Sequence, residues 1–209
     1  MVDHWSIRSQ LSVPAGNPRM LEKALQSEAD AFFLDLEDAT APDKKAAARA
    51  AVVEVLDRPD WHDRERVVRI NAIGSVWCLR DLLAVVGEAA TPPDRLVVPK
   101  VQSAGDIAFV DRVIDQLLRE RGTPDLSIAL EVQIEDAHGL GNLDTILLES
   151  RRIAIVTFGQ GDFAASIGMP ADEIGVADEW DAAVQGDRWL LPRQSIVFAG
   201  ARYRLPALN

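Results

Sequence analysis

The feature that most constrains the fold is a regular alternation of short apolar runs with longer segments of helical pattern. Six runs rich in β-branched residues are expected to be strands: residues 8–13, 31–36, 65–71, 95–100, 126–134 and 152–159. Helical segments lie between them, most clearly at residues 17–29, 43–57 and 103–122. Alternating strands and helices predict parallel strands joined by right-handed crossovers. We therefore expect an α/β fold.

The expected strands read as apolar on both faces, which is typical of a sheet that helices cover. Two architectures fit this pattern, an open doubly wound sheet and a (β/α)8 barrel. In both, ligands bind where the strands end, at their carboxyl ends. With 209 residues, 48% of them apolar, and no shared repeat or long linker, the chain is expected to form a single domain over residues 1–209.

Charge and composition exclude several classes of protein. The net charge of -11 repels phosphate backbones, so nucleic acid is not an expected partner. No stretch approaches 18 uninterrupted apolar residues and the N-terminus does not resemble a signal peptide, so we expect no membrane span and a cytoplasmic location. The single cysteine, Cys78, permits no intrachain disulfide and agrees with a reducing compartment.

Acidic residues stand where three of the expected strands end. Asp35, Glu37 and Asp38 close "AFFLDLED", Glu135 follows "LSIALEVQI", and Asp162 follows "RIAIVTFG". Each acid alone has an ordinary structural explanation, as a helix cap or the partner of a surface lysine. Together they indicate a site, because the carboxyl ends of parallel strands converge. Glu135 and Asp162, on consecutive strands, would repel each other unless a cation lay between them, and oxygen ligands favour Mg2+ over Zn2+.

Arg69 lies at the end of another expected strand, "VVRIN", where a permanent cation can clamp a carboxylate or stabilise an enolate oxygen. A buried ion pair with one of the "DLED" acids is the alternative. The segment "GQGDFA" matches the outline of a dinucleotide-binding loop, but Asp162 within it would repel a pyrophosphate. No motif of a serine hydrolase or a zinc protease occurs.

A longer pattern of segments resembles the HpcH/HpaI aldolase and citrate lyase beta-subunit family, and within it the malyl-CoA lyase branch. The matching segments, in the family's order, are "RSQLSVPAGNPRMLEKAL", "FFLDLEDATAPDKKAAARA", "VVRINAIGS", "VVPKVQSAGDI", "QIEDAHGLGN", "FGQGDFAASIGM" and "GDRWLLPRQSIVFAGARYRLP". The resemblance implies a (β/α)8 TIM barrel with Mg2+, or Mn2+, held by Glu135 and Asp162. Arg69 falls on the substrate-binding arginine, and Gly161 on a further substrate contact.

The resemblance also implies where the substrate lies. The coenzyme A phosphates and adenine are expected near Asn17, Arg19 and Lys23, where a helix N-terminus offers N–H groups to a phosphate. Around the metal ligands, Asp35, Glu37 and Asp38 are expected to orient the site. The family continues beyond the phrase that matches "LPALN", so two barrel strands and a C-terminal lid, which supplies the acid or base for the enolate, are expected to be absent from these 209 residues.

The activity implied is a retro-aldol or Claisen-type cleavage of a 3-hydroxyacyl-CoA, such as malyl-CoA, methylmalyl-CoA or citramalyl-CoA. Mg2+ would hold the substrate's carboxylate and hydroxyl, and Arg69 would stabilise the enolate oxygen. The products would be a 2-oxo acid, glyoxylate or pyruvate, and an acyl-CoA. Two alternatives stay open, a malyl-CoA thioesterase and a non-catalytic paralogue that binds coenzyme A and metal. The family resemblance further implies a homotrimer or homohexamer.

Overall fold

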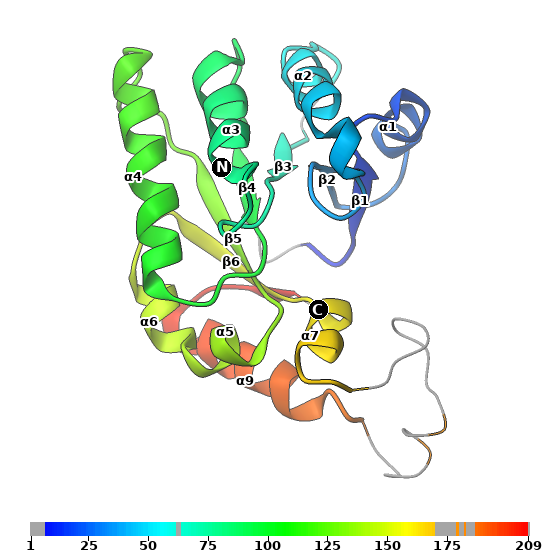
Figure 1. Ribbon diagram of the computed structural model, residues 1–209, viewed down its shortest axis with the longest axis vertical. Coiled ribbons are helices and arrows are strands. Elements are labelled where there is room, and N and C mark those ends of the chain that lie inside the picture. Colours follow the sequence, from blue (N-terminus) through cyan, green and yellow to red (C-terminus); the bar gives the residue numbers. More distant parts are fainter. Residues whose placement is uncertain (1–6, 62–63, 170–178, 180–181, 183–186, 209) are drawn as a thin grey trace.

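A single curled sheet of parallel strands organises the computed structural model, which describes residues 7–61, 64–169, 179, 182 and 187–208 (Figure 1). Seven strands follow one another in the sheet in the same order as in the chain, and every neighbouring pair is parallel. They are β1 (Gln10–Pro14), β2 (Ala31–Asp35), β3 (Val67–Arg69), β4 (Arg95–Val98), β5 (Ala129–Ile134), β6 (Ile153–Phe158) and β7 (Ala207–Leu208). A doubly wound sheet reverses its strand order, so this uninterrupted order favours the winding of a β/α barrel.

Helices lie along the outer side of the sheet, roughly in the order of the strands that they connect (Figure 1). The α-helices are α1 (Pro18–Leu25), α2 (Lys45–Leu56), α3 (Cys78–Leu82), α4 (Ala104–Glu120), α5 (Ala137–Gly141), α6 (Leu143–Leu148), α7 (Gln160–Ser166) and α9 (Leu190–Tyr203). A 3-10 turn, η2 (Pro42–Lys44), precedes α2, and a π-helical segment, η3 (Leu83–Glu88), continues α3. No helix among the described residues is both long and apolar enough to span a membrane.

Local sequence explains where the helices begin. The side chain of Asn17 accepts a hydrogen bond from Met20 N at 3.1 Å, and Pro18 occupies the first turn of α1. At α4, the Asp106 carboxylate accepts hydrogen bonds from Gln102 N at 2.8 Å and Ser103 N at 2.9 Å. Both helices begin just after a strand ends, so these caps set the direction in which the chain leaves the carboxyl ends of the strands.

The two faces of the sheet differ in polarity. Side chains such as Leu34, Leu96 and Val132 pack in one large apolar core against the helices. The concave face instead carries a buried charged group, in which Arg95 pairs with Glu65 and Glu131. The same face also carries the buried apolar side chains Phe33, Val67 and Val97, so the expectation of strands apolar on both faces holds there only in part. The charges are tolerated there because each is paired and hydrogen-bonded.

The number of strands also differs from the expectation. Six strands were expected to be present and two absent, whereas Ala207 and Leu208 pair with Val156 and Thr157 of β6 as a seventh strand. Two residues are too few to show an apolar period, so only the three-dimensional pairing reveals this strand. The strand count in these 209 residues is corrected from six to seven.

Candidate active site

An ion pair between neighbouring strands forms the base of the site. Asp35 and Arg69 are the last residues of β2 and β3 and lie opposite each other in the parallel register. Arg69 donates from Nε to Asp35 Oδ1 at 2.8 Å and from Nη2 to Oδ2 at 2.6 Å, so the contact is two-pronged. Both residues are buried. This pairing was the structural alternative for Arg69, and the structure confirms that the pair exists.

Asp35 is held ionised by its surroundings. Its carboxylate also accepts hydrogen bonds from Glu37 N at 2.8 Å, Ala39 N at 3.2 Å and the Ser12 hydroxyl at 3.2 Å. Desolvation by burial acts to raise the pKa of Asp35, but the guanidinium of Arg69 and these N–H groups outweigh it and lower the pKa. Asp35 therefore works as a fixed anchor that aims the guanidinium.

The third guanidinium nitrogen of Arg69 points into the site with looser contacts. Nη1 lies 3.4 Å from Gln133 Oε1 and 3.5 Å from Glu37 Oε2. Both distances exceed those of the Asp35 pair. Nη1 is thus the donor of Arg69 that can turn to a ligand without breaking the ion pair beneath it.

Glu135 follows β5 and is 4% exposed. Its Oε2 accepts a hydrogen bond from Lys100 N at 3.0 Å. The side chain lies directly over Gly159, where an added Cβ would fall 2.3 Å from Glu135 Oε1, so only glycine leaves room for it. Desolvation, followed by repulsion from Glu37 and Asp162, raises the pKa of Glu135 to about 8.

Three further acids gather around one lysine. The ammonium of Lys100, just after β4, lies 2.9 Å from Glu37 Oε1, 3.2 Å from Asp38 Oδ1 and 3.2 Å from Asp162 Oδ2. Desolvation acts to lower the pKa of Lys100, but Glu37 and the neighbouring carboxylates hold it above its ordinary value. The structure thus brings all six predicted residues of the inner site together, namely Asp35, Glu37, Asp38, Arg69, Glu135 and Asp162.

Glu37 is the least satisfied of these acids. Both of its carboxylate oxygens are buried, and neither accepts a well-directed hydrogen bond from the part of the chain that the structure describes, although Lys100 Nζ is close. Burial raises its pKa. A buried carboxylate left in this state is a strong acceptor for a ligand, a water molecule or a cation.

The donor set fits a hard divalent cation that the protein holds only in part. Within the described ranges, no three His, Cys, Asp or Glu side chains are placed to hold a metal on their own. The ionised forms of Glu135 and Asp162 nevertheless repel each other, and an ionised Glu37 adds to this repulsion. Mg2+ is commonly bound through one or two carboxylates, with water and substrate oxygens completing its shell. The geometry is compatible with such a site and not with a closed structural one.

Sequence reasoning missed Gln133 as a functional candidate, and it placed Lys100 at the end of the expected strand 95–100 without giving it a role. Gln133 points inward from β5 to Arg69, and Lys100 contacts four carboxylates, through its N–H and its ammonium. Period-two alternation along β5 places Gln133 on the same face as Glu131 and Glu135, which is the signal that identifies it. Asp136, the acid next to Glu135, instead caps α5, because its side chain accepts a hydrogen bond from Gly139 N at 2.8 Å.

The residues expected to bind coenzyme A lie at a neighbouring strand end. Arg19 and Lys23 are exposed on α1, one turn apart, and Gly161 lies in the first turn of α7 beside Asp162. Asn17 borders a hollow of about 480 Å³ between the end of β1 and α2, whose other lining residues include Gly16, Lys44 and several alanines. The small side chains give this hollow a mainly apolar floor.

A second hollow, of about 340 Å³, opens beside the acids. Glu37, Asp38, Asn71 and Lys100 line it. Thr40 and Ala41 line both this hollow and the apolar one, so the two adjoin across the loop after β2. An elongated ligand can therefore place one end on the apolar floor and the other against the acids.

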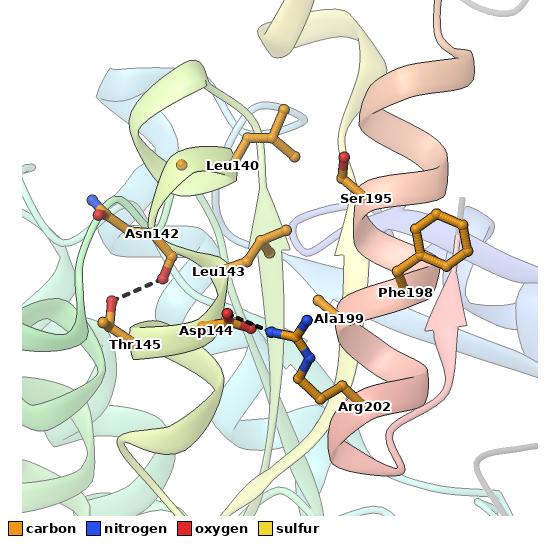
Figure 2. A pocket seen from close by; sticks show the side chains of 10 residues that line it. Leu140, Asn142, Leu143, Asp144, Thr145, Ser195, Phe198, Ala199 and Arg202 are labelled. Carbon is orange, nitrogen blue, oxygen red and sulfur yellow. Dashed lines mark hydrogen bonds and ion pairs between the residues drawn. The ribbon is translucent and has the colours of Figure 1, made fainter.

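Another hollow, of about 290 Å³, lies between α5, α6 and α9 (Figure 2). Arg202 of α9 reaches across it to Asp144 of α6, with Nη1 2.6 Å from Oδ2 (Figure 2). None of the acids described above lines it. We assign the candidate active site to the strand ends and not to this hollow.

Comparison with known proteins places the chain in one family. Residues 8–183 match the HpcH/HpaI aldolase/citrate lyase family. L-malyl-CoA/beta-methylmalyl-CoA lyase from Cereibacter sphaeroides is 37% identical over 172 residues, which cover 82% of this chain and 54% of the relative. Malyl-CoA/beta-methylmalyl-CoA/citramalyl-CoA lyase from Chloroflexus aurantiacus is 35% identical over 148 residues, which cover 71% of this chain and 42% of the relative.

Among solved structures, protein CitE from Mycobacterium tuberculosis in complex with magnesium, acetoacetate and coenzyme A matches with a TM-score of 0.67 and 25% identity. The match covers 96% of this chain and 65% of that chain. The chain thus spans about half the length of the lyases that it matches.

Proposed function

The chain belongs to the HpcH/HpaI aldolase/citrate lyase family, and from this premise we propose that its site cleaves the carbon–carbon bond of a 3-hydroxyacyl-CoA with the help of Mg2+. The substrate class is that of the similar lyases, malyl-CoA, methylmalyl-CoA or citramalyl-CoA. In the cleavage the 3-hydroxyl would lose its proton and become the carbonyl of a 2-oxo acid. The electron pair of the broken carbon–carbon bond would form the enolate of an acyl-CoA, which then takes up a proton.

The observation that carries this proposal is the state of Glu135. A carboxylate buried beside Glu37 and Asp162, with its pKa raised to about 8, is poorly stabilised as a structural group. A divalent cation held by Glu135 and Asp162 would make the ionised form of this carboxylate favourable. Glu135 and Asp162 would hold Mg2+, and the buried oxygens of Glu37 would accept hydrogen bonds from polar ligands nearby. When bound, Mg2+ supplies a Lewis acid for substrate oxygens.

Arg69 is placed to stabilise charge that develops during the reaction. The thioester carbonyl is neutral in the substrate and becomes negative as the carbon–carbon bond breaks. Asp35 fixes two nitrogens of the guanidinium and leaves Nη1 facing the site, so the donor is oriented before the charge appears. Preorganised donors of this kind lower a barrier because they need no reorientation.

The adjoining hollows give room for the rest of the substrate. We place the acyl end at the side of the polar hollow that Glu37 and Lys100 form, because Lys100 contacts Glu135 and Asp162, which do not themselves line the hollow. The coenzyme A moiety would follow the apolar hollow past Asn17, with its phosphates toward Arg19 and Lys23. Asn17 already uses its side-chain oxygen to cap α1, so its part in binding would fall to its remaining polar groups. The acidic net charge of the chain makes these local cations necessary.

Product analysis tests this proposal. Malyl-CoA is incubated with the protein in Mg2+ or in chelator, and glyoxylate is trapped while acetyl-CoA is quantified. We expect equal amounts of glyoxylate and acetyl-CoA in Mg2+ and neither in chelator. Malate with free coenzyme A would show a thioesterase. Substrate binding without any product would favour the non-catalytic reading.

A further inference from the structure

Lys100 contacts both of the residues that we propose as metal ligands. Its backbone N–H donates to Glu135 Oε2 at 3.0 Å, and its ammonium lies 3.2 Å from Asp162 Oδ2. The same ammonium reaches Glu37 Oε1 at 2.9 Å and Asp38 Oδ1 at 3.2 Å. One residue thus joins acids that come from the ends of three other strands.

An uncommon backbone conformation makes this double contact possible. Lys100 has a φ of 52°, in the left-handed region that residues other than glycine seldom adopt. The strand β4 ends at Val98, and the turn at Lys100 aims the N–H and the side chain at one cluster. Strained conformations of this kind persist where the surrounding structure fixes them, often at functional sites.

The charges around Lys100 explain what its ammonium does. Glu37, Asp38 and Asp162 surround it, while the nearby cation Arg69 is committed to Asp35 through two nitrogens. Arg69 Nη1 lies farther from Glu37, at 3.5 Å from Oε2, and the ammonium of Lys45 donates to the backbone carbonyl of Glu37. The ammonium of Lys100 is therefore the nearest counter-charge of these three carboxylates. It has no lone pair with which to bind a metal, and it repels a divalent cation that approaches Asp162.

We propose that Lys100 is the internal counter-ion of this metal site: its ammonium neutralises Asp162 and Glu37 when no metal is bound, and a divalent cation must displace it from Asp162. This inference rests on the proposed function for the presence of the metal. It makes Lys100 a positioning residue that lowers the affinity for metal while keeping the empty site ordered. The backbone N–H holds Glu135 in both states.

Titration of Mn2+ by calorimetry tests the inference on the metal-free chain, three variants of Lys100 and one control variant. Lys100→Met removes the charge but keeps the stem and the backbone preference. Lys100→Gly suits the left-handed backbone and covers the case in which the methionine variant folds poorly. Lys100→Arg keeps the charge. Arg112→Met, on the exposed side of α4, is the control for loss of one positive charge far from the site.

We expect Lys100→Met and Lys100→Gly to bind Mn2+ more tightly than the wild type by about tenfold or more, because a unit charge near a divalent ion is removed. Lys100→Arg and Arg112→Met should stay within about threefold of the wild type, since their effect on the local charge is small. Unchanged or weaker binding in both Lys100→Met and Lys100→Gly would overturn the inference, because the lysine would then support the ligands and not compete with the metal.

Thermal unfolding supplies a second readout that a purely structural role would not produce. Without metal, Lys100→Met should lower Tm by about 3 °C or more, because the acids lose their counter-charge. Saturating Mn2+ should close this gap, whereas an equal loss of Tm with and without metal would contradict the inference. Failure of the wild type and all variants to bind Mn2+ would overturn the metal site itself, and with it both proposals.

Discussion

Replacing Glu135 with glutamine should stabilise the metal-free protein at high pH. The carboxylate of Glu135 is buried, and its pKa rises from an ordinary value of 4.5 to about 8 through desolvation and repulsion by Glu37 and Asp162. A glutamine oxygen can still accept the N–H of Lys100, which now donates to Glu135 Oε2 at 3.0 Å. The substitution therefore removes the buried charge and keeps the hydrogen bond.

The direction in which stability changes with pH depends on whether the folded or the unfolded state holds the proton of Glu135 more tightly. Between pH 4.5 and 8 the folded protein keeps a proton on Glu135 that the unfolded chain releases, so the free energy of unfolding falls as pH rises through this window. Above about pH 8 both states are ionised and this contribution is fully lost. Each unit of pKa corresponds to about 1.4 kcal/mol, which sets an upper bound of roughly 5 kcal/mol. Relaxation of the site around the ionised carboxylate makes the actual loss of unfolding free energy smaller than this bound. We expect the loss to be at least about 2 kcal/mol.

Urea unfolding in chelator at pH 5.5 and pH 8.5 measures the effect, with the free energy taken by linear extrapolation. The stability of Glu135→Gln relative to the wild type should increase by at least about 2 kcal/mol between the two pH values. Glu54→Gln, on the exposed face of α2, is the control and should show no such change. A difference that is the same at both pH values, or a variant less stable at pH 8.5, would refute the reasoning.

Other substitutions test the remaining parts of the site. Arg69→Lys keeps the charge but loses the planar fork, so kcat for malyl-CoA cleavage should fall by roughly 10²-fold with a smaller change in KM; a raised KM with unchanged kcat would make Arg69 a binding anchor instead. Asp35→Asn leaves a buried guanidinium without its anchor and should cost about 3 to 5 kcal/mol in urea unfolding, whereas a loss below about 1 kcal/mol would show that the pair is dispensable. Cys78 is buried with its pKa raised to about 12, so a thiol reagent at pH 8 should react with it only after unfolding, and rapid labelling of the native protein would contradict that environment.

Much of the fold follows from the pattern of apolar residues along the sequence. The six apolar runs become β1 to β6 within a few residues of their expected ends, because each run is long enough to show a buried strand between turn residues. The two-residue strand β7 carries no such signal. Its position depends on pairing with β6, a contact far away in the sequence.

The site was predictable where it depends on topology. Parallel strands bring their ends together, so Asp35, Arg69, Glu135 and Asp162 converge as expected. The role of Lys100 was not predictable, because it depends on a left-handed backbone conformation at this lysine. Glycine and asparagine are the residues that usually indicate such a conformation in a sequence, and Lys100 is neither. The buried charged group on the concave face was also missed, since Glu131 within an apolar run gives no sign of its partner Arg95.

Binding of Mn2+ to the chain, followed by electron paramagnetic resonance, tests the central claim most directly, because it depends only on the acids at the strand ends. We predict one bound ion per chain in the wild type. Glu135→Gln and Asp162→Asn should each weaken binding by at least about tenfold, since each removes one of two carboxylate ligands. Wild-type affinity in both variants would contradict the account, because these carboxylates would then not hold the metal on which the proposed cleavage depends.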